Sequence, residues 1–435
     1  MKPRIHIYLS VLLLAFLSAE SQKITKTDRL LLANLQHHFE ALSADTAGGR
    51  AMGSPGEKAA GDYVISELSQ AGARPKGDHN GWLQTFTIDE GRQIGADALF
   101  TIDEHPLTVG REWFPLALSP AAEVTGSPAI ALQESGVPWF QDLREWLEAG
   151  ADNPRFDLAG EIRAKAISCA KKGATALILY NSSTRYPDKL TFNPRDKPEP
   201  VTIPVIYITR EAKHKYLKDE SASVDLRIRI SFAGQHRTGN NIIAFLDNGA
   251  PTTVAIGTRY DNSSGLAAMI ELARLLAASK LKNNNYLFLV FSGSDHQWPG
   301  SEYYAAHPVI DLKKMNYLIE LDRLNTPADT LNIGGFNSSS AWAVVGNSVR
   351  ERSTRNNSTR ERNALSLHYD SSADQPGDHS AFYRQQIPVL VFSTGHGSAD
   401  GPHDPGNYPG ELRAFKFIYA LIEGANSQGR LAFTK

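Results

Sequence analysis

The stretch from Thr253 to Gly300 decides the fold. It reads TVAIGTRYDNSSGLAAMIELARLLAASKLKNNNYLFLVFSGSDHQWPG. Its apolar runs at 253–257 and 286–291 have the length of buried strands and are too short for buried helices. Between them, residues 265–280 place apolar side chains at helical spacing, with Asn262 or Ser263 as the cap. The order strand, helix, strand predicts a parallel pair joined by a right-handed crossover.

Polar turns follow both of these strands. The first contains Asp261 and the second contains Asp295. In an open α/β sheet, ligands and catalytic groups collect at the carboxyl ends of the strands. We therefore expect both carboxylates to face one crevice.

Length and charge limit the classes of protein to consider. The chain has 435 residues, which favours two domains over one core. Its net charge of -2 and pI near 6.7 give no broad basic surface. Nucleic acid and anionic membranes are therefore not predicted partners.

The first residues have the layout of an export signal. A basic start precedes an apolar run at 7–17, and small residues follow at Ser18, Ala19 and Ser21. The run is shorter than the roughly 20 residues of a membrane-spanning helix, although an uncleaved anchor is the alternative. We predict a signal peptide at 1–21 and a soluble protein exported to the periplasm or outside the cell. Cys169 is the only cysteine, so no intrachain disulfide is expected.

The remaining chain divides into three predicted parts at 22–112, 113–232 and 233–435. In the first part, Ser54, Pro55 and Glu57 form a capping box, and we interpret the helix after them as a packing helix without chemistry. In the second, a helix at 159–172 leads to strands at 176–180 and 202–209. In the third, Asn-Gly at 248–249 lies between two apolar runs and predicts a hairpin.

Ordered motifs in the last part carry a family resemblance. They are Asp-Asn-x-Ser-Gly at 261–265, Gly-Ser-Glu-Tyr-Tyr at 300–304, Leu-Asp at 321–322 and Asp-His-x-x-Phe at 378–382. In this order they resemble the di-zinc aminopeptidases of clan MH, peptidase family M28. Residues 113–232 resemble the protease-associated (PA) domain that many members carry. The resemblance implies a three-layer α/β zinc-exopeptidase fold, with a mostly parallel sheet between helices and an inserted, β-rich PA-like domain.

The resemblance also implies a chemistry for these residues. In the family, two zinc ions activate a water while a neighbouring Glu takes its proton. Asp261 matches the bridging Asp, Asp322 matches the later Asp ligand, and His403 matches the final His. Asp295 stands where the family has a Glu ligand. These four residues are the predicted metal ligands, with zinc as the implied cofactor.

The departures from the family pattern are as informative as the matches. Arg259 stands where a His ligand belongs, and Ser294 stands at the general-base position. Asp261, Asp295 and His403 remain as a three-ligand set, which suits at most one zinc, or none. The guanidinium of Arg259 is expected to pair with Asp261 and Asp322 in place of the missing cation.

Other histidines near these motifs have alternative roles. His296 and His396 are candidate substitutes for missing groups. Asp378 and His379 are expected to form a structural hydrogen-bonding pair beneath the site.

Three functions follow from this pattern. The first is a catalytically impaired family member that binds peptides or protein N-termini, or serves as a scaffold. The second is an active zinc-dependent aminopeptidase with an altered metal site. The third is a single-zinc acyl transferase similar to the glutaminyl cyclases of the same clan.

Overall fold

The computed structural model describes residues 25–44, 49–151, 153, 155–186, 190–324, 330–356, 365–370, 375–394 and 408–434. The predicted signal peptide, His396 and His403 lie outside these residues. The chain divides into two compact units, the first formed by residues 1–86 and 238–435 and the second by 87–237. Each unit is described by itself. Among the described residues, none of the helices has the length and apolar character needed to cross a membrane.

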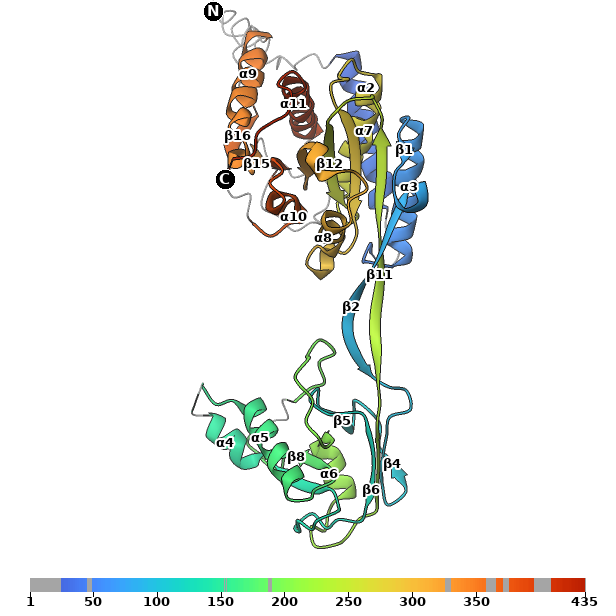
Figure 1. Cartoon of the computed structure of the whole chain (residues 1–435), viewed down its shortest axis with the longest axis vertical. Coiled ribbons are helices and arrows are strands. Elements are labelled where there is room, and N and C mark those ends of the chain that lie inside the picture. Colours follow the sequence, from blue (N-terminus) through green and yellow to red (C-terminus); the bar gives the residue numbers. More distant parts are fainter. Residues whose placement is uncertain are drawn as a thin grey trace, which may run out of the picture. The chain divides into compact units, whose positions relative to one another are not determined.

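The first unit combines one large sheet with helices (Figure 1). Its helices are α2 (Lys26–Ser43), α3 (Pro55–Gln70), α7 (Ser263–Ala278), α8 (Pro299–Ala306), α9 (Ala341–Asn356), α10 (Asp378–Arg384) and α11 (Tyr408–Asn426). Its strands are β1 (Arg74–Pro75), β2 (Leu83–Ile94), β11 (Phe232–Leu246), β12 (Thr253–Arg259), β13 (Asn285–Phe291), β14 (Met315–Leu321), β15 (Thr330–Gly334), β16 (Ser366–Tyr369) and β17 (Val389–Ser393). Short 3-10 helices lie at Asp78–Asn80 (η1), Ser294–His296 (η2), Leu312–Lys314 (η3) and Phe336–Ser338 (η4). The unit boundaries fall within β2 and β11.

The sheet is mixed, with parallel strands at its centre. Its order is β1-β11-β13-β12-β14-β17-β15-β16, and β2 pairs with β11. The four central strands β13, β12, β14 and β17 are parallel, whereas β11 and β15 run antiparallel to their central neighbours. The predicted parallel pair of β12 and β13 is therefore confirmed, with Arg259 opposite Phe291.

Helices cover both faces of this sheet. Ile256 of β12 and Phe288 of β13 belong to a buried cluster with residues of α2, α3, α7, α9 and α11. The residues adjacent to these two point to the opposite face of the sheet, where Ala255 and Leu289 pack with residues of α8 and α10. Because successive strand residues point to opposite faces, the sheet is buried on both sides. The predicted three-layer α/β class is confirmed.

The predicted hairpin at Asn248-Gly249 is wrong. β11 pairs antiparallel with β13, and β12 lies on the other side of β13. The side-chain oxygen of Asn285 accepts the backbone N–H groups of Asn248 and Ala250 at 2.9 and 3.1 Å, so the start of β13 holds the turn open. All residues of β13 are buried, and a strand with two apolar faces is stabilised most as a central strand.

The capping signals in the first unit act as the sequence indicates. Asn262 caps α7, where its side-chain oxygen accepts the N–H of Gly265 at 2.9 Å. Ser54 caps α3 and accepts the N–H of Glu57 at 3.1 Å. Glu57 in turn accepts the N–H of Gly53 at 2.6 Å through Oε2, one residue before the cap.

The second unit contains two four-stranded sheets and three helices within its described residues. Its strands are β3 (Leu99–Ile102), β4 (His105–Pro106), β5 (Trp113–Pro115), β6 (Ala122–Gly126), β7 (Trp139–Asp142), β8 (Leu177–Tyr180), β9 (Val205–Ile208) and β10 (Leu226–Ile230). Its helices are α4 (Arg144–Ala151), α5 (Leu158–Lys171) and α6 (Arg210–Tyr216). The sheets have the orders β4-β3-β10-β6 and β5-β9-β8-β7.

Two buried clusters hold the second unit together. Phe100 of β3 and Ile206 of β9 belong to a cluster that joins the two sheets. Leu179 of β8 packs in another cluster with Ile162 and Ala166 of α5. The unit spans 87–237, whereas the sequence set a PA-like insertion at 113–232. That this unit is a PA domain stays a prediction.

Candidate functional site

Three parallel strands of the first unit end at one edge of the sheet. β12 ends at Arg259, β13 at Phe291 and β14 at Leu321. The residues that follow, 260–262, 292–298 and 322–324, carry the side chains singled out in the sequence. This is the edge at which open α/β sheets bind ligands.

Arg259 joins the two predicted metal-binding carboxylates of the first and third turns. Its Nε lies 3.2 Å from Oδ1 of Asp261, and one terminal nitrogen lies 3.1 Å from Oδ1 of Asp322. The side chains of Arg259 and Asp322 are 18% and 19% exposed. Burial alone would lower the pKa of Arg259, but Asp261 and Asp322, followed by Glu320 and Asp378, raise it above its ordinary value. The guanidinium therefore remains a fixed cation between the carboxylates.

Hydrogen bonds from the first turn lock it to the third. The carbonyl oxygen of Leu321 accepts the Thr258 hydroxyl and the Asn262 amide, each at 2.8 Å. The N–H of Leu324 donates to the hydroxyl of Ser264 at 2.9 Å. Because these groups are buried, the bonds also satisfy polar atoms that water cannot reach. The positions of Asp261 and Asp322 are thereby fixed relative to each other.

A buried charged group lies beneath Arg259. His379 donates its backbone N–H to Oε2 of Glu320 at 2.8 Å, and its Nδ1 lies 2.8 Å from the same oxygen. Burial opposes charge on both groups, but each partner outweighs it: His379 lowers the pKa of Glu320, and Glu320 raises that of His379. Burial and the Glu320 carboxylate raise the pKa of Asp378 to about 8. His379 therefore pairs with Glu320, which the sequence analysis did not single out, and the expected pairing of His379 with Asp378 is corrected.

The second turn holds three more of the predicted residues. Ser294, Asp295 and His296 form the 3-10 helix η2 directly after β13. Nε2 of His296 lies 3.3 Å from Oδ2 of Asp295, whose side chain is 42% exposed. An imidazole therefore lies next to Asp295, as the substitute role for His296 requires.

The segment interpreted as a packing helix also contacts this edge, through a residue whose contact the sequence analysis did not predict. Ser292 Oγ–H donates to Oε1 of Glu57, and both residues are buried. Arg50 donates to the hydroxyl of Ser263, in the first turn of α7, at 2.8 Å. The capping pattern accounted for Glu57 in the sequence, so its second contact, with Ser292, was not expected. The sequence offered one signal for this contact: a carboxylate has two oxygens and the cap uses only one, so the other was left to accept a hydrogen bond elsewhere.

The described residues do not fit a two-zinc centre. Asp261 and Asp322 both pair with one guanidinium, which already offsets one of the two negative charges that would hold a metal. Across the part of the chain that the structure describes, no three His, Cys, Asp or Glu side chains are grouped so as to bind a metal ion. His403, the third member of the predicted single-zinc set, lies outside that part.

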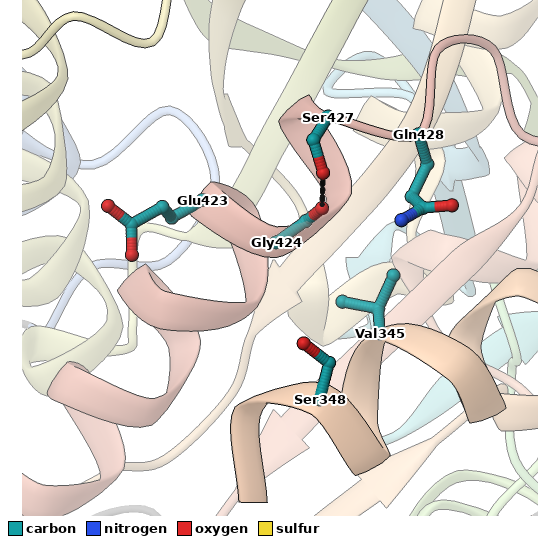
Figure 2. A pocket seen from close by; sticks show the side chains of 6 residues that line it. All are labelled: Val345, Ser348, Glu423, Gly424, Ser427 and Gln428. Atoms are coloured by element: carbon teal, nitrogen blue, oxygen red, sulfur yellow. Dashed lines mark hydrogen bonds between the residues drawn. The ribbon is translucent and has the colours of Figure 1, made fainter. Parts of the chain in front are cut away.

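A hollow between α9 and the end of α11 is separate from these turns (Figure 2). There the hydroxyl of Ser427 donates to the carbonyl oxygen of Gly424 at 2.8 Å. The hollow contains none of the predicted site residues. It is lined by Val345, Ser348, Glu423, Gly424, Ser427 and Gln428.

Comparisons with known proteins address this first unit most directly. Residues 249–409 match the model of Peptidase family M28. No curated protein matches the chain. That stretch includes β12, β13, β14 and the three turns described above.

Solved structures show a broader but weaker similarity. The aminopeptidase from Aneurinibacillus sp. strain AM-1 is 18% identical, with a TM-score of 0.45 over 93% of this chain and 95% of that one. BSAP, a zinc aminopeptidase from Bacillus subtilis, is 18% identical, with a TM-score of 0.45 over 90% and 94%. The Peptidase M28 precursor from Shewanella amazonensis SB2B is 18% identical, with a TM-score of 0.45 over 94% and 98%.

Proposed function

We propose that this chain is an exported, peptidase-like protein that binds peptides and hydrolyses them poorly, and the match of residues 249–409 to the model of Peptidase family M28 supports this proposal. The observation that carries the proposal is the pair of contacts from Arg259 to Asp261 and Asp322. A cation that belongs to the protein lies where the family resemblance would put a metal ligand. The site keeps its acidic groups but has lost the arrangement that activates water.

The proton transfer that hydrolysis needs is also impaired in this proposal. Ser294 stands at the general-base position, and a hydroxyl does not accept a proton from water at neutral pH. Loss of a positioned general base costs about 10²–10⁴ in rate. Together with the pairing of Arg259, this substitution supports binding over catalysis.

The proposed ligand is a peptide or a protein N-terminus. The side chains of Asp261 and Asp295 are 40% and 42% exposed, so a ligand can reach both carboxylates. Each can accept charge-assisted hydrogen bonds from an ammonium group without a metal. The free amino group is therefore the feature that we propose the site recognises.

At most one zinc, or none, belongs to this proposal. Asp261, Asp295 and His403 would be its ligands, and bound zinc would supply Lewis-acid polarisation of a carbonyl. The pairing of Arg259 with Asp261 and Asp322 argues against a second ion.

An active zinc-dependent aminopeptidase with an altered site is the second candidate. The observation in its favour is the position of His296, whose Nε2 lies 3.3 Å from Asp295. An imidazole there is a general base in reach of the exposed carboxylate edge.

Turnover and binding assays on the mature protein separate the two candidates. We expect near-background hydrolysis of aminoacyl-anilide substrates with added zinc, together with calorimetric binding of peptides that have free N-termini. N-acetylated peptides of the same sequence are the matched control and should bind about tenfold more weakly or not at all. Robust turnover that disappears in Asp261→Asn would overturn the proposal and leave the active enzyme.

A further inference from the structure

The turn after β13 has an unfavourable backbone. Gln297 and Trp298 have φ values of 64° and 60°, and Gly293 has a φ of 87°. A non-glycine residue in the left-handed region costs roughly 1–2 kcal/mol. Such a conformation persists only where the surrounding structure fixes it, and it is concentrated at functional sites. The turn therefore needs an anchor.

One anchor comes from α3, more than two hundred residues earlier in the chain. Oε1 of Glu57 accepts the hydroxyl of Ser292, and Oε2 accepts the N–H of Gly53 at 2.6 Å. Glu57 is 3% exposed and Ser292 is 1% exposed, so water does not compete for these bonds. Charge-assisted hydrogen bonds of this kind are stronger than neutral ones.

A second anchor holds both ends of the turn to Asn241. The N–H of Ser292 donates to Oδ1 of Asn241 at 3.1 Å, and Nδ2 of Asn241 donates to the carbonyl oxygen of Gly300 at 2.8 Å. A Cβ on Gly300 would lie 2.5 Å from Oδ1 of Asn241, so this close approach requires glycine. Asn241 thus fixes the span of the turn, while Glu57 holds the side chain at its start.

Burial also perturbs the titration of Glu57. Burial, opposed by the bonds from Ser292 and Gly53 and reinforced by Asp295, raises the pKa of Glu57. Trp298, in the same turn, is half-buried and immediately precedes α8.

We propose that Glu57 is a positioning residue for the turn Ser292–Pro299, acting through Ser292 to hold the backbone that carries Ser294 and Asp295. The inference rests on the proposed function for the identity of the ligand. It differs from a capping role, because the bond to Gly53 serves the helix and the bond to Ser292 serves the turn. The two roles predict different effects of substitution.

Amide hydrogen exchange of residues 293–298 tests the proposal directly. Glu57→Ala and Ser292→Ala should each speed exchange in this turn by about 10- to 100-fold, and the double variant should add little to either. Ser54→Ala is the matched control, because it removes the α3 cap bond without touching Ser292. In Ser54→Ala, the amides of the turn after β13 should exchange at the wild-type rate.

Three results decide the proposal. Unchanged exchange of the turn in Ser292→Ala would overturn it, even if Glu57→Ala fails to fold. Equal acceleration in Ser54→Ala would also overturn it, since the cap would then be sufficient. Partial recovery of protection in Glu57→Gln, which keeps the shape and one acceptor, would support it.

Peptide binding separates this proposal from the proposed function. If the wild type binds a free N-terminal peptide, Glu57→Ala and Ser292→Ala should each raise Kd about tenfold, whereas Ser54→Ala should not. If the wild type binds no peptide, the proposed function fails, and the exchange of residues 293–298 still decides whether Glu57 positions the turn.

Discussion

The first and second turns at the carboxyl edge of the sheet are built in opposite ways. The first, at 260–262, has no residue with positive φ. Its bonds reach residues nearby in the chain or the adjacent turn, such as Asn262 to Gly265 and to Leu321. The second, at 292–299, has a strained backbone and depends on Glu57 and Asn241 from distant segments.

This difference teaches where each turn's stability originates. In the first turn, Arg259 pairs with both Asp261 and Asp322, so charges within this part of the site stabilise one another. In the second, the Asp295–His296 pair is partly exposed and is expected to contribute little. Its backbone conformation is instead held by buried polar contacts with Glu57 and Asn241, which are distant in the chain. A strained backbone persists only where surrounding contacts hold it in this way.

Removal of the central cation should produce the largest effect. Arg259→Leu leaves Asp261 and Asp322 facing each other above Glu320, and we expect it to reduce the free energy of unfolding by about 3 kcal/mol. Urea denaturation of the full chain would measure this loss in the free energy of unfolding, and differential scanning calorimetry would check it. Asp295→Asn, in the second turn, is the control and should change stability by under about 0.5 kcal/mol.

Equal losses in Arg259→Leu and Asp295→Asn would break the comparison. The first turn would then owe its stability to its backbone bonds alone, and the ion pairs would be incidental.

The pH dependence of stability should show the next largest effect. Asp378 has a pKa of about 8 in the fold against an ordinary value of 3.8. Between these values the folded protein binds more protons than the unfolded chain, so the free energy of unfolding falls as pH rises from 5 to about 8. Asp378→Asn should flatten this dependence by about 1–3 kcal/mol, measured by urea denaturation across that range.

Gln297→Gly, which changes no charge, should keep the wild-type slope in the same experiment. An unaltered slope in Asp378→Asn would mean that Asp378 titrates near its ordinary value and that the charged group beneath Arg259 is differently balanced.

Relief of strain in the second turn should give the smallest effect, with the opposite sign. Gln297 is exposed and has a φ of 64°, so Gln297→Gly removes strain and loses few contacts. We expect it to raise the free energy of unfolding by about 0.5–1 kcal/mol. Differential scanning calorimetry would detect the rise in Tm. Asn262→Gly in the unstrained first turn is the comparison and should lower Tm, since it removes a cap. A loss of stability in Gln297→Gly would show that the second turn is not strained.

Sequence was sufficient wherever the signal is local. Apolar periodicity and the Asn262 cap placed α7 between two parallel strands, and the rule for carboxyl ends put Asp261 and Asp295 at one edge. The contacts of Arg259 with Asp261 and Asp322 are those expected from its charge and place in the chain. Their role in function remains a proposal.

What the sequence by itself determined was the elements, the α/β class and the chemistry available at each strand end, because short-range spacing dictates these. Only the tertiary structure decided the order of β11, β13 and β12, since that order depends on which strand gains most from burial on both faces. The tertiary structure alone also brought Glu57 to Ser292. A cap satisfies one carboxylate oxygen locally, and only the folded chain determines what the other one meets.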